Sequence, residues 1–148
     1  MTHSLQIRVY YEDTDLAGIV YYANYLRFIE RARSEMVRAA GIDQTALKSA
    51  GLVFAVRRVE ADYLSPARFD DLIEVRTTLT ALKGASFTMA QEIWRDDTLL
   101  FRADVTLVIL TETGRPAVFR QISAHAWPPL RRKQATDAEV FAFPLTTC

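Results

Sequence analysis

The spacing of hydrophobic residues divides the chain into one long helix and a series of strands. Apolar and polar residues alternate over residues 4–12, which predicts a half-buried strand. Over residues 22–40 the apolar positions recur every three or four residues, which predicts one face of a helix. On its outer side, Glu30 with Arg33 and Arg31 with Glu35 are spaced to form ion pairs. After Gly51 the strand-like period of two returns and continues.

Four further strands and a short helix are predicted beyond the long helix. The helix is expected at residues 44–49, and the strands at residues 52–64, 72–83, 86–95 and 99–111. Short links with turn-forming residues favour an antiparallel meander. A sheet with one apolar face must be covered, and the long helix is the available cover. The pattern therefore predicts an α+β fold in which a curved antiparallel sheet of about five strands wraps a long central helix.

Length and composition indicate a single folded domain. The chain has 148 residues, of which 50% are hydrophobic, and only five Gly and five Pro interrupt them. We predict one domain at residues 1–130 and a C-terminal tail at residues 131–148, which begins with a basic run expected to be solvated. A sheet of this kind has open edges, and pairing with a second copy is the usual remedy, so a homodimer or homotetramer is expected.

Charge and local composition exclude several classes of protein. The 18 basic residues balance the 18 acidic ones, which argues against a nucleic-acid binder. The N-terminus has none of the features of a signal peptide, and no apolar run approaches the roughly 20 residues of a transmembrane helix. One cysteine, Cys148, cannot form an internal disulfide. We therefore expect a soluble cytoplasmic protein.

Residues 12–21, here called the acidic turn, place Glu12, Asp13 and Asp15 between a strand and the long helix. The spacing resembles a calcium loop, but Ala17 occupies the fifth position and Asn24 the twelfth, where a bidentate Glu is needed. His3 and His125 are far apart in the sequence, which makes transition-metal binding equally poor. No metal is expected.

Of three other roles for the acidic turn, the residues disfavour the first and leave the other two open. A haloacid-dehalogenase-type phosphatase would need Thr or Val where Ala17 stands and an alternating α/β fold. Asp13 and Asp15 could instead favour the N-terminus of the helix, where an acid typically contributes about 0.3–1 kcal/mol. A carboxylate beside a helix N-terminus could also split a thioester, because the free amides stabilise the carbonyl oxygen.

Three segments together resemble the hotdog-fold acyl-CoA thioesterases, over about residues 5–118. They read VYYEDTDLAGIVYYANYLRFIERARSEM, YLSPARFDDLIEV and LKGASF. The nearer branch is the thioesterase associated with the Tol–Pal envelope system, and 4-hydroxybenzoyl-CoA thioesterases form the neighbouring branch. The resemblance implies hydrolysis of acyl-CoA to free acid and CoA, without a cofactor.

The resemblance also assigns roles within the acidic turn. Asp15 would be the catalytic carboxylate, acting as nucleophile or general base, and Asp13 with Glu12 would shape the turn. The helix N-terminus near Tyr22 would polarise the thioester carbonyl through a backbone N–H. Many Tol–Pal-type members have His at position 22, whereas Tyr is typical of the aromatic branch, so the sequence does not select an acyl group.

The remaining substrate contacts are expected from two separate segments of the sequence. They are Gly18, Val20 and Asn24 at the start of the helix, and Lys83 and Ser86 in a turn, where the aromatic branch binds the nucleotide and phosphates of CoA. In that branch these contacts often cross a subunit boundary. Tyr21 and Tyr25 are expected in the core or pocket wall, and Pro66 and Asp71 at the start of a strand.

A binding module is the rival interpretation from another functional class. Such a hotdog dimer would hold an acyl-CoA or an acyl carrier protein without hydrolysing it and would dock to envelope or lipid-synthesis proteins. The spacing of Asp15 and Tyr22 favours the enzyme.

Overall fold

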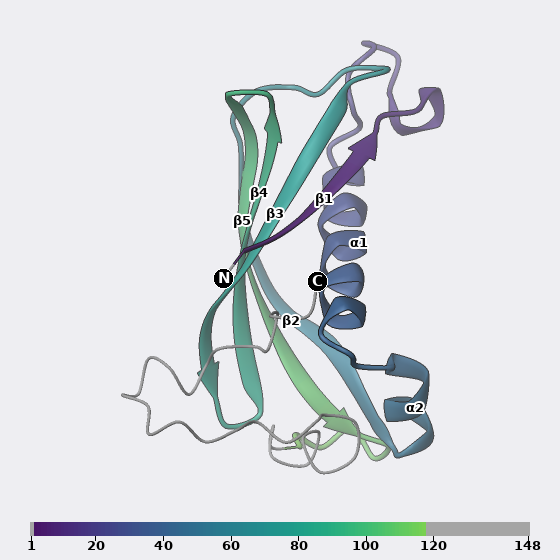
Figure 1. Ribbon diagram of the computed structural model, residues 1–148, viewed down its shortest axis with the longest axis vertical. Helices are drawn as coiled ribbons and strands as arrows, with labels where there is room; N and C mark the ends of the chain where they lie inside the picture. The colour runs from purple at the N-terminus through teal and green to yellow at the C-terminus, as the bar shows by residue number, and fades with distance from the viewer. Residues whose placement is uncertain (1, 118–148) are drawn as a thin grey trace.

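The computed structural model describes residues 2–117, which form one curved sheet around one long helix. Its elements are β1 (Thr2–Arg8), the 3-10 helix η1 (Tyr11–Asp13), α1 (Asn24–Ala39), α2 (Gln44–Ser49), β2 (Leu52–Tyr63), β3 (Leu72–Lys83), β4 (Ser86–Arg95) and β5 (Thr98–Thr111). The five strands are all antiparallel, in the order β1-β3-β4-β5-β2. Figure 1 shows α1 lying along one face of the sheet. The predicted fold, including the β3-β4-β5 meander, is confirmed.

The helix α1 lies against the sheet because its apolar side chains fall on one face. Tyr25, Phe28, Ile29, Ala32 and Met36 are each at most 3% exposed. They meet the inward-facing side chains of the strands in a single core. Complete burial of one large apolar side chain contributes about 1.5–3 kcal/mol, so this stripe fixes both the position and the rotation of the helix.

The first strand ends earlier than its alternation predicts. The predicted strand at residues 4–12 is wrong at its C-terminal end, because β1 stops at Arg8, which pairs with Leu72, the first residue of β3. Beyond that point only Val9 continues the backbone pairing, with Asp70 and Asp71 just before β3. The Tyr10 N–H instead donates to the carboxylate of Asp13 at 2.8 Å, and the chain turns. The pattern of side chains thus continues past the end of the backbone pairing.

The start of α1 also differs from expectation. The helix begins at Asn24, and its N-cap residue Ala23 makes no side-chain hydrogen bond. Asp13 and Asp15 therefore do not cap α1 directly, and a contribution of their charge through the helix dipole stays a prediction. The expected ion pairs on the outer side are absent within residues 2–117, where Glu35 pairs with Arg38 instead.

Arg33 belongs to a buried polar cluster rather than to the surface. Its side chain is only 9% exposed, and Nη1 donates to Oε1 of Gln91 at 2.9 Å. The Gln91 amide in turn donates to Ile29 O and to Thr77 Oγ1, each at 2.9 Å. Burial lowers the pKa of Arg33 from its ordinary value, with Glu30 opposing the shift. This cluster ties the middle of α1 to β3 and β4.

The outer strands of the sheet leave two edges. β1 and β2 each pair with a single neighbour, and Val53, Val56 and Val59 on β2 are 41%, 49% and 40% exposed.

No helix within residues 2–117 is both long and apolar enough to cross a membrane. The predicted tail at residues 131–148 lies outside the described residues, as do His125 and Cys148.

Candidate active site

The acidic turn is closed by backbone hydrogen bonds around Asp15. Its N–H donates to Ile19 O at 2.9 Å, and its own carbonyl accepts the N–H of Gly18 at 3.0 Å. Gly18 has a φ of +78°, in the left-handed region that glycine adopts without steric cost. No heavy atom lies within 4 Å of where a Cβ would be, so the backbone conformation and not space requires glycine here.

The Asp15 side chain is exposed, and one of its two carboxylate oxygens is held in place. Oδ1 accepts the N–H of Ala17 at 2.9 Å, an Asx-turn that fixes the side chain over its own turn. No donor within residues 2–117 is bonded to Oδ2. A carboxylate held by one oxygen and free at the other can attack a carbonyl carbon or accept a proton from water.

Asp13 connects this turn to the helix. Its carbonyl accepts both the Tyr21 N–H at 3.0 Å and the side-chain amide of Asn24 at 2.9 Å. A β-bridge between Thr14 and Val20 joins the two sides of the turn between these contacts. Asn24 therefore orients the first turn of α1 against the acidic turn, and Asp13 braces the turn as the sequence predicts.

The backbone that leads into α1 offers free amides. Within residues 2–117 the N–H groups of Tyr22 and Ala23 have no acceptor, whereas the Asn24 N–H donates to Tyr21 O at 2.8 Å. The helix is 16 residues long, so its dipole adds partial positive charge at this end. Free amides and a helix N-terminus together stabilise negative charge on a carbonyl oxygen. Tyr22 lies two residues before α1, and its side chain is 61% exposed.

A loop at residues 64–71 holds the acidic turn in place through backbone contacts. Val20, buried in the core, donates its N–H to Ala67 O at 2.8 Å, and Ile19 forms a β-bridge with Arg68. The Ala67 N–H donates to the hydroxyl of Tyr25 at 2.9 Å. Burial raises the pKa of this hydroxyl, so Tyr25 is a neutral, buried part of the core. Val20 thus supports the site through its backbone, while its side chain fills the core.

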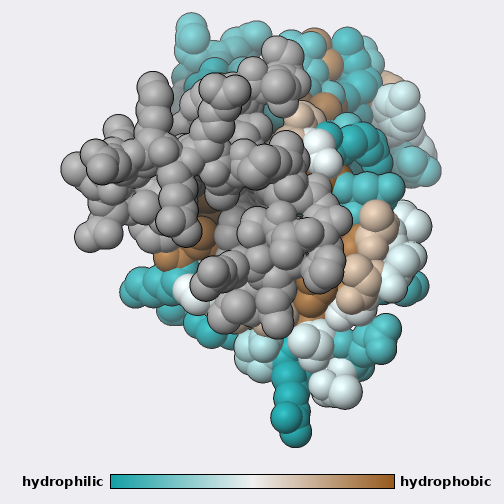
Figure 2. All heavy atoms as spheres, turned by 60° about the horizontal axis from the view of Figure 1, so that its bottom comes forward, coloured by the Kyte–Doolittle hydropathy of each residue, from teal (hydrophilic) through white to brown (hydrophobic). Residues whose placement is uncertain are grey.

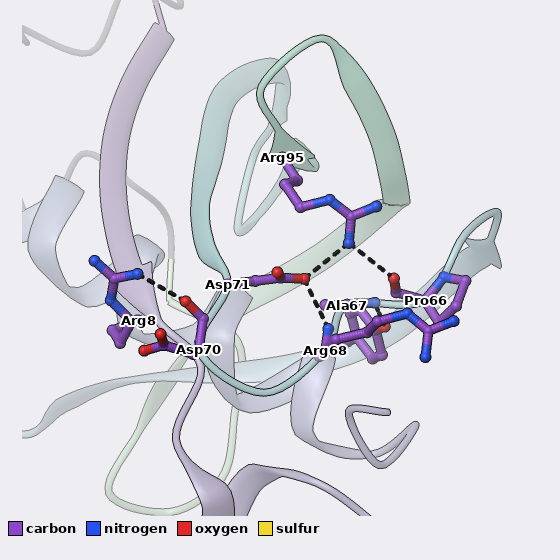
Figure 3. Close-up of polar contacts among 8 residues, drawn as sticks. Arg8, Pro66, Ala67, Arg68, Asp70, Asp71 and Arg95 are labelled. Atoms are coloured by element: carbon purple, nitrogen blue, oxygen red, sulfur yellow. Dashed lines mark hydrogen bonds and ion pairs between the residues drawn. The ribbon is translucent and has the colours of Figure 1, made fainter. Parts of the chain in front are cut away.

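An ion pair fixes this supporting loop to the C-terminal end of β4. Asp71 Oδ2 accepts the Arg68 N–H and Arg95 Nη1, each at 2.8 Å, and Arg95 also donates to Pro66 O at 3.2 Å. Figure 3 shows Arg95 reaching Asp71 and Pro66 on one side of the loop, while Arg8 reaches the carbonyl of Asp70 on the other. Pro66 and Asp71 shape the start of β3, as predicted from the sequence.

Lys83 and Ser86 lie at the opposite end of the molecule from the acidic turn. They flank the turn between β3 and β4, where Ser86 Oγ donates to Lys83 O at 3.2 Å. Because Leu72 at the other end of β3 pairs with Arg8, the whole strand separates them from the acidic turn, a distance on the order of 30 Å. Figure 1 shows this separation. Figure 2 turns the lower end of that view forward and shows hydrophobic residues among hydrophilic ones.

The structure therefore brings together only part of the predicted site. Asp15, Gly18, Val20, Tyr22 and Asn24 lie in one region, as the sequence predicts for neighbours along the chain. Lys83 and Ser86 do not join them within one chain.

Two parts of this region escape sequence reasoning. One is Tyr63, whose hydroxyl donates to Tyr22 O at 2.8 Å, and the other is the pair of Asp71 and Arg95. The sequence signals Asp71 only as a residue at the start of a strand. Neither Tyr63 nor Arg95 carries a local signal of its role.

No cluster of three or more His, Cys, Asp or Glu side chains within residues 2–117 is placed to hold a metal ion. The acids of the turn point to different partners, since Asp13 bonds the Tyr10 N–H and Asp15 bonds the Ala17 N–H. Independence of the reaction from metal stays a prediction.

Comparisons with known proteins agree with the resemblance stated from the sequence. The family model of the thioesterase superfamily matches residues 17–101, a range that begins just after Asp15 and includes Tyr22, Lys83 and Ser86. The acyl-CoA thioester hydrolase YbgC of Escherichia coli O6:H1 is 45% identical over 103 residues, which cover 69% of this chain and 77% of that protein.

Solved structures show the same fold. The crystal structure of a probable thioesterase from Bartonella henselae has a TM-score of 0.77 at 39% identity, and the match covers 80% of this chain and 99% of that one. Slr0204, a 1,4-dihydroxy-2-naphthoyl-CoA thioesterase from Synechocystis, has a TM-score of 0.76 at 25% identity, with coverage of 82% and 91%. The fold is the hotdog fold predicted from the sequence, and the chain belongs to the thioesterase superfamily.

Proposed function

We propose that this chain hydrolyses acyl-CoA thioesters to a free acid and CoA, with Asp15 as the working carboxylate. The observation that carries the proposal is the position of Asp15, which is anchored on a turn whose Asp13 carbonyl accepts hydrogen bonds from Tyr21 and Asn24, the residues on either side of the free amides of Tyr22 and Ala23. The YbgC relative at 45% identity is an acyl-CoA thioester hydrolase, which supports the same reaction for this chain.

The proposed chemistry needs only these groups and water. The amides of Tyr22 and Ala23 donate to the thioester carbonyl oxygen and stabilise the negative charge that develops on it. Asp15 either takes a proton from a water that attacks the carbonyl carbon, or attacks that carbon itself to give an anhydride that water then opens. In both routes the carbon–sulfur bond breaks and CoA leaves as a thiolate that takes up a proton. Because position 22 is Tyr, the proposal assigns no role to a His at this position.

Gly18, Val20 and Asn24 have supporting roles in this proposal. Gly18 permits the left-handed backbone that closes the turn, and Val20 anchors the turn to Ala67. Asn24 holds the start of α1 against Asp13. These three residues set the distance between the carboxylate and the free amides.

A second subunit completes the site in this proposal. Lys83 and Ser86, the expected contacts for the nucleotide and phosphates of CoA, lie at the far end of the same chain and need a second copy to reach Asp15. The exposed valines of the edge strand β2 support pairing of two copies along this edge. Light scattering should give at least a dimer, and mixing an Asp15→Asn chain with a Lys83→Ala chain should restore activity.

The experiment that tests the proposed function is thiol release from an acyl-CoA panel of short aliphatic, long aliphatic and aromatic groups. We expect release from at least one substrate, unchanged by a metal chelator. The best substrate selects between the Tol–Pal-type and aromatic branches. No release from a folded protein that binds the same acyl-CoA would refute the enzyme and favour the binding module.

The wider cellular setting stays a prediction. A cytoplasmic location, an acyl carrier protein or lipid-synthesis proteins as partners, and a physical link to the Tol–Pal proteins are expectations from the resemblance. Each is tested separately, by fractionation and by copurification with the chain.

A further inference from the structure

Tyr63 connects the end of β2 to the backbone just before α1. It is the last residue of its strand, and its hydroxyl donates to Tyr22 O at 2.8 Å across 41 positions of sequence. Its ring packs edge-on against Tyr25 and Phe101, with centroids 5.3 and 5.0 Å away. The ring is thereby held from two sides, and the hydroxyl is directed at a single carbonyl.

The carbonyl that Tyr63 contacts shares a peptide unit with a free amide. The C=O of Tyr22 and the N–H of Ala23 lie in one plane, because the peptide bond between them is planar. A hydrogen bond to the oxygen fixes the orientation of that plane. It also polarises the amide, which strengthens the N–H as a donor at the other side of the unit. Within residues 2–117 the Ala23 N–H has no acceptor of its own.

The protonation state of Tyr63 suits this contact. Burial raises the pKa of its hydroxyl above the ordinary value, and the neighbouring Tyr22 and Tyr25 raise it further. The group therefore remains a neutral donor throughout the pH range in which a thioesterase would be assayed. No other donor within residues 2–117 contacts the Tyr22 carbonyl.

We propose that Tyr63 is a positioning residue for the thioesterase reaction, which orients the Tyr22–Ala23 peptide so that its free amide meets the thioester carbonyl oxygen. This inference rests on the proposed function. Tyr63 does not touch the reacting atoms in this account. It acts through the backbone of Tyr22, and its effect belongs to the step in which negative charge forms on the oxygen.

The substitution that isolates this role is Tyr63→Phe. Phenylalanine keeps the ring and its edge-on contacts but removes the hydroxyl. Complete loss of one oxyanion donor lowers kcat by about 10²–10³. Because the amide would remain in place but less well oriented, we expect kcat to fall about tenfold, with KM within twofold of wild type.

Tyr25→Phe is the matched control. It removes the same atom from the same aromatic cluster, but there the hydroxyl accepts the N–H of Ala67 in the core. The buried Ala67 N–H would lose its partner, so Tyr25→Phe should be the less stable of the two variants. If activity simply followed stability, Tyr25→Phe would also be the less active one. The proposal predicts the opposite order for kcat.

The experiment measures kcat, KM and urea unfolding for wild type and both variants on the best acyl-CoA substrate. It adds calorimetric binding of a thioether analogue that lacks the carbonyl oxygen, which should bind wild type and Tyr63→Phe equally. A kcat for Tyr63→Phe within twofold of wild type would overturn the inference. A kcat that falls in the order of stability would also overturn it. A wild-type protein that releases no thiol would refute the proposed function instead, so the two failures are distinguishable.

Discussion

The ion pair of Asp71 and Arg95 allows a sharp test of how the site is supported. Asp71→Asn keeps the shape of the side chain and one acceptor oxygen but removes the negative charge. In the native protein a single oxygen of Asp71 accepts both the Arg68 N–H and Arg95 Nη1, each at 2.8 Å. The Asp71 and Arg95 side chains are 22% and 30% exposed, so water screens the pair only in part.

The expected loss follows from the two hydrogen bonds. A bond to a charged group contributes about 1.5–3 kcal/mol and a neutral one about 0.5–1.5 kcal/mol, so each bond weakens by about 1 kcal/mol. Asp71→Asn should therefore lower the free energy of unfolding by about 2 kcal/mol. For a small domain with a urea m-value near 2 kcal/mol/M, that moves the midpoint of unfolding down by about 1 M.

Asp70→Asn is the matched control, because it removes the same charge one residue earlier. Asp70 contacts Arg8 through its backbone carbonyl, and its φ of +69° is one that asparagine tolerates. Its midpoint should move by less than a quarter of the shift for Asp71→Asn. Urea unfolding is compared at one protein concentration, because dimerisation would make stability depend on it. Equal shifts for the two variants would refute the reasoning, since net charge rather than the contact would then be responsible.

Two further predictions concern buried and exposed polar groups. Gln91→Leu should lower the free energy of unfolding by about 3 kcal/mol, because buried Arg33 loses its bonded acceptor. Adding Arg33→Met to this variant should recover at least half of the lost free energy. Urea unfolding measures both changes. Hydrogen bonds from Arg76 and Ser4 lower the pKa of Glu74 from 4.5, so its stabilising contribution is present above that pH and is lost as the pH falls through the lowered value. Thermal unfolding of Glu74→Gln should accordingly show a small deficit at pH 7 that vanishes in acid, and a deficit that persists unchanged at low pH would contradict this.

The local pattern of the sequence was enough to predict most of the fold. The bounds of α2, β3 and β4 agree with prediction, because side chains there alternate or recur as long as the backbone pairing or helix continues. The alternation does not predict the end of β1, because Asp13 accepts the Tyr10 N–H while the apolar alternation continues. Helical spacing predicts Arg33 on the surface, because no local rule shows that Gln91, 58 residues away, provides its acceptor.

The candidate site was predictable where its residues are neighbours in the chain. Asp15 and Tyr22 are brought close by a turn whose residues are adjacent in sequence, so the motif alone locates them. Tyr63 and Arg95 reach the same region only through the order of the strands, which composition and periodicity do not determine. The distance of Lys83 from Asp15 likewise follows from the pairing of β1 with β3.

The most direct test of the central claim is thiol release by Asp15→Asn beside wild type and Asp13→Asn. Asparagine at position 15 can still accept the Ala17 N–H, so the turn should survive while the carboxylate is lost. We predict that kcat falls at least about a hundredfold for Asp15→Asn with folding intact. Asp13→Asn, which weakens the bond to the Tyr10 N–H, should mainly lower stability. An Asp15→Asn protein as active as wild type would contradict the account.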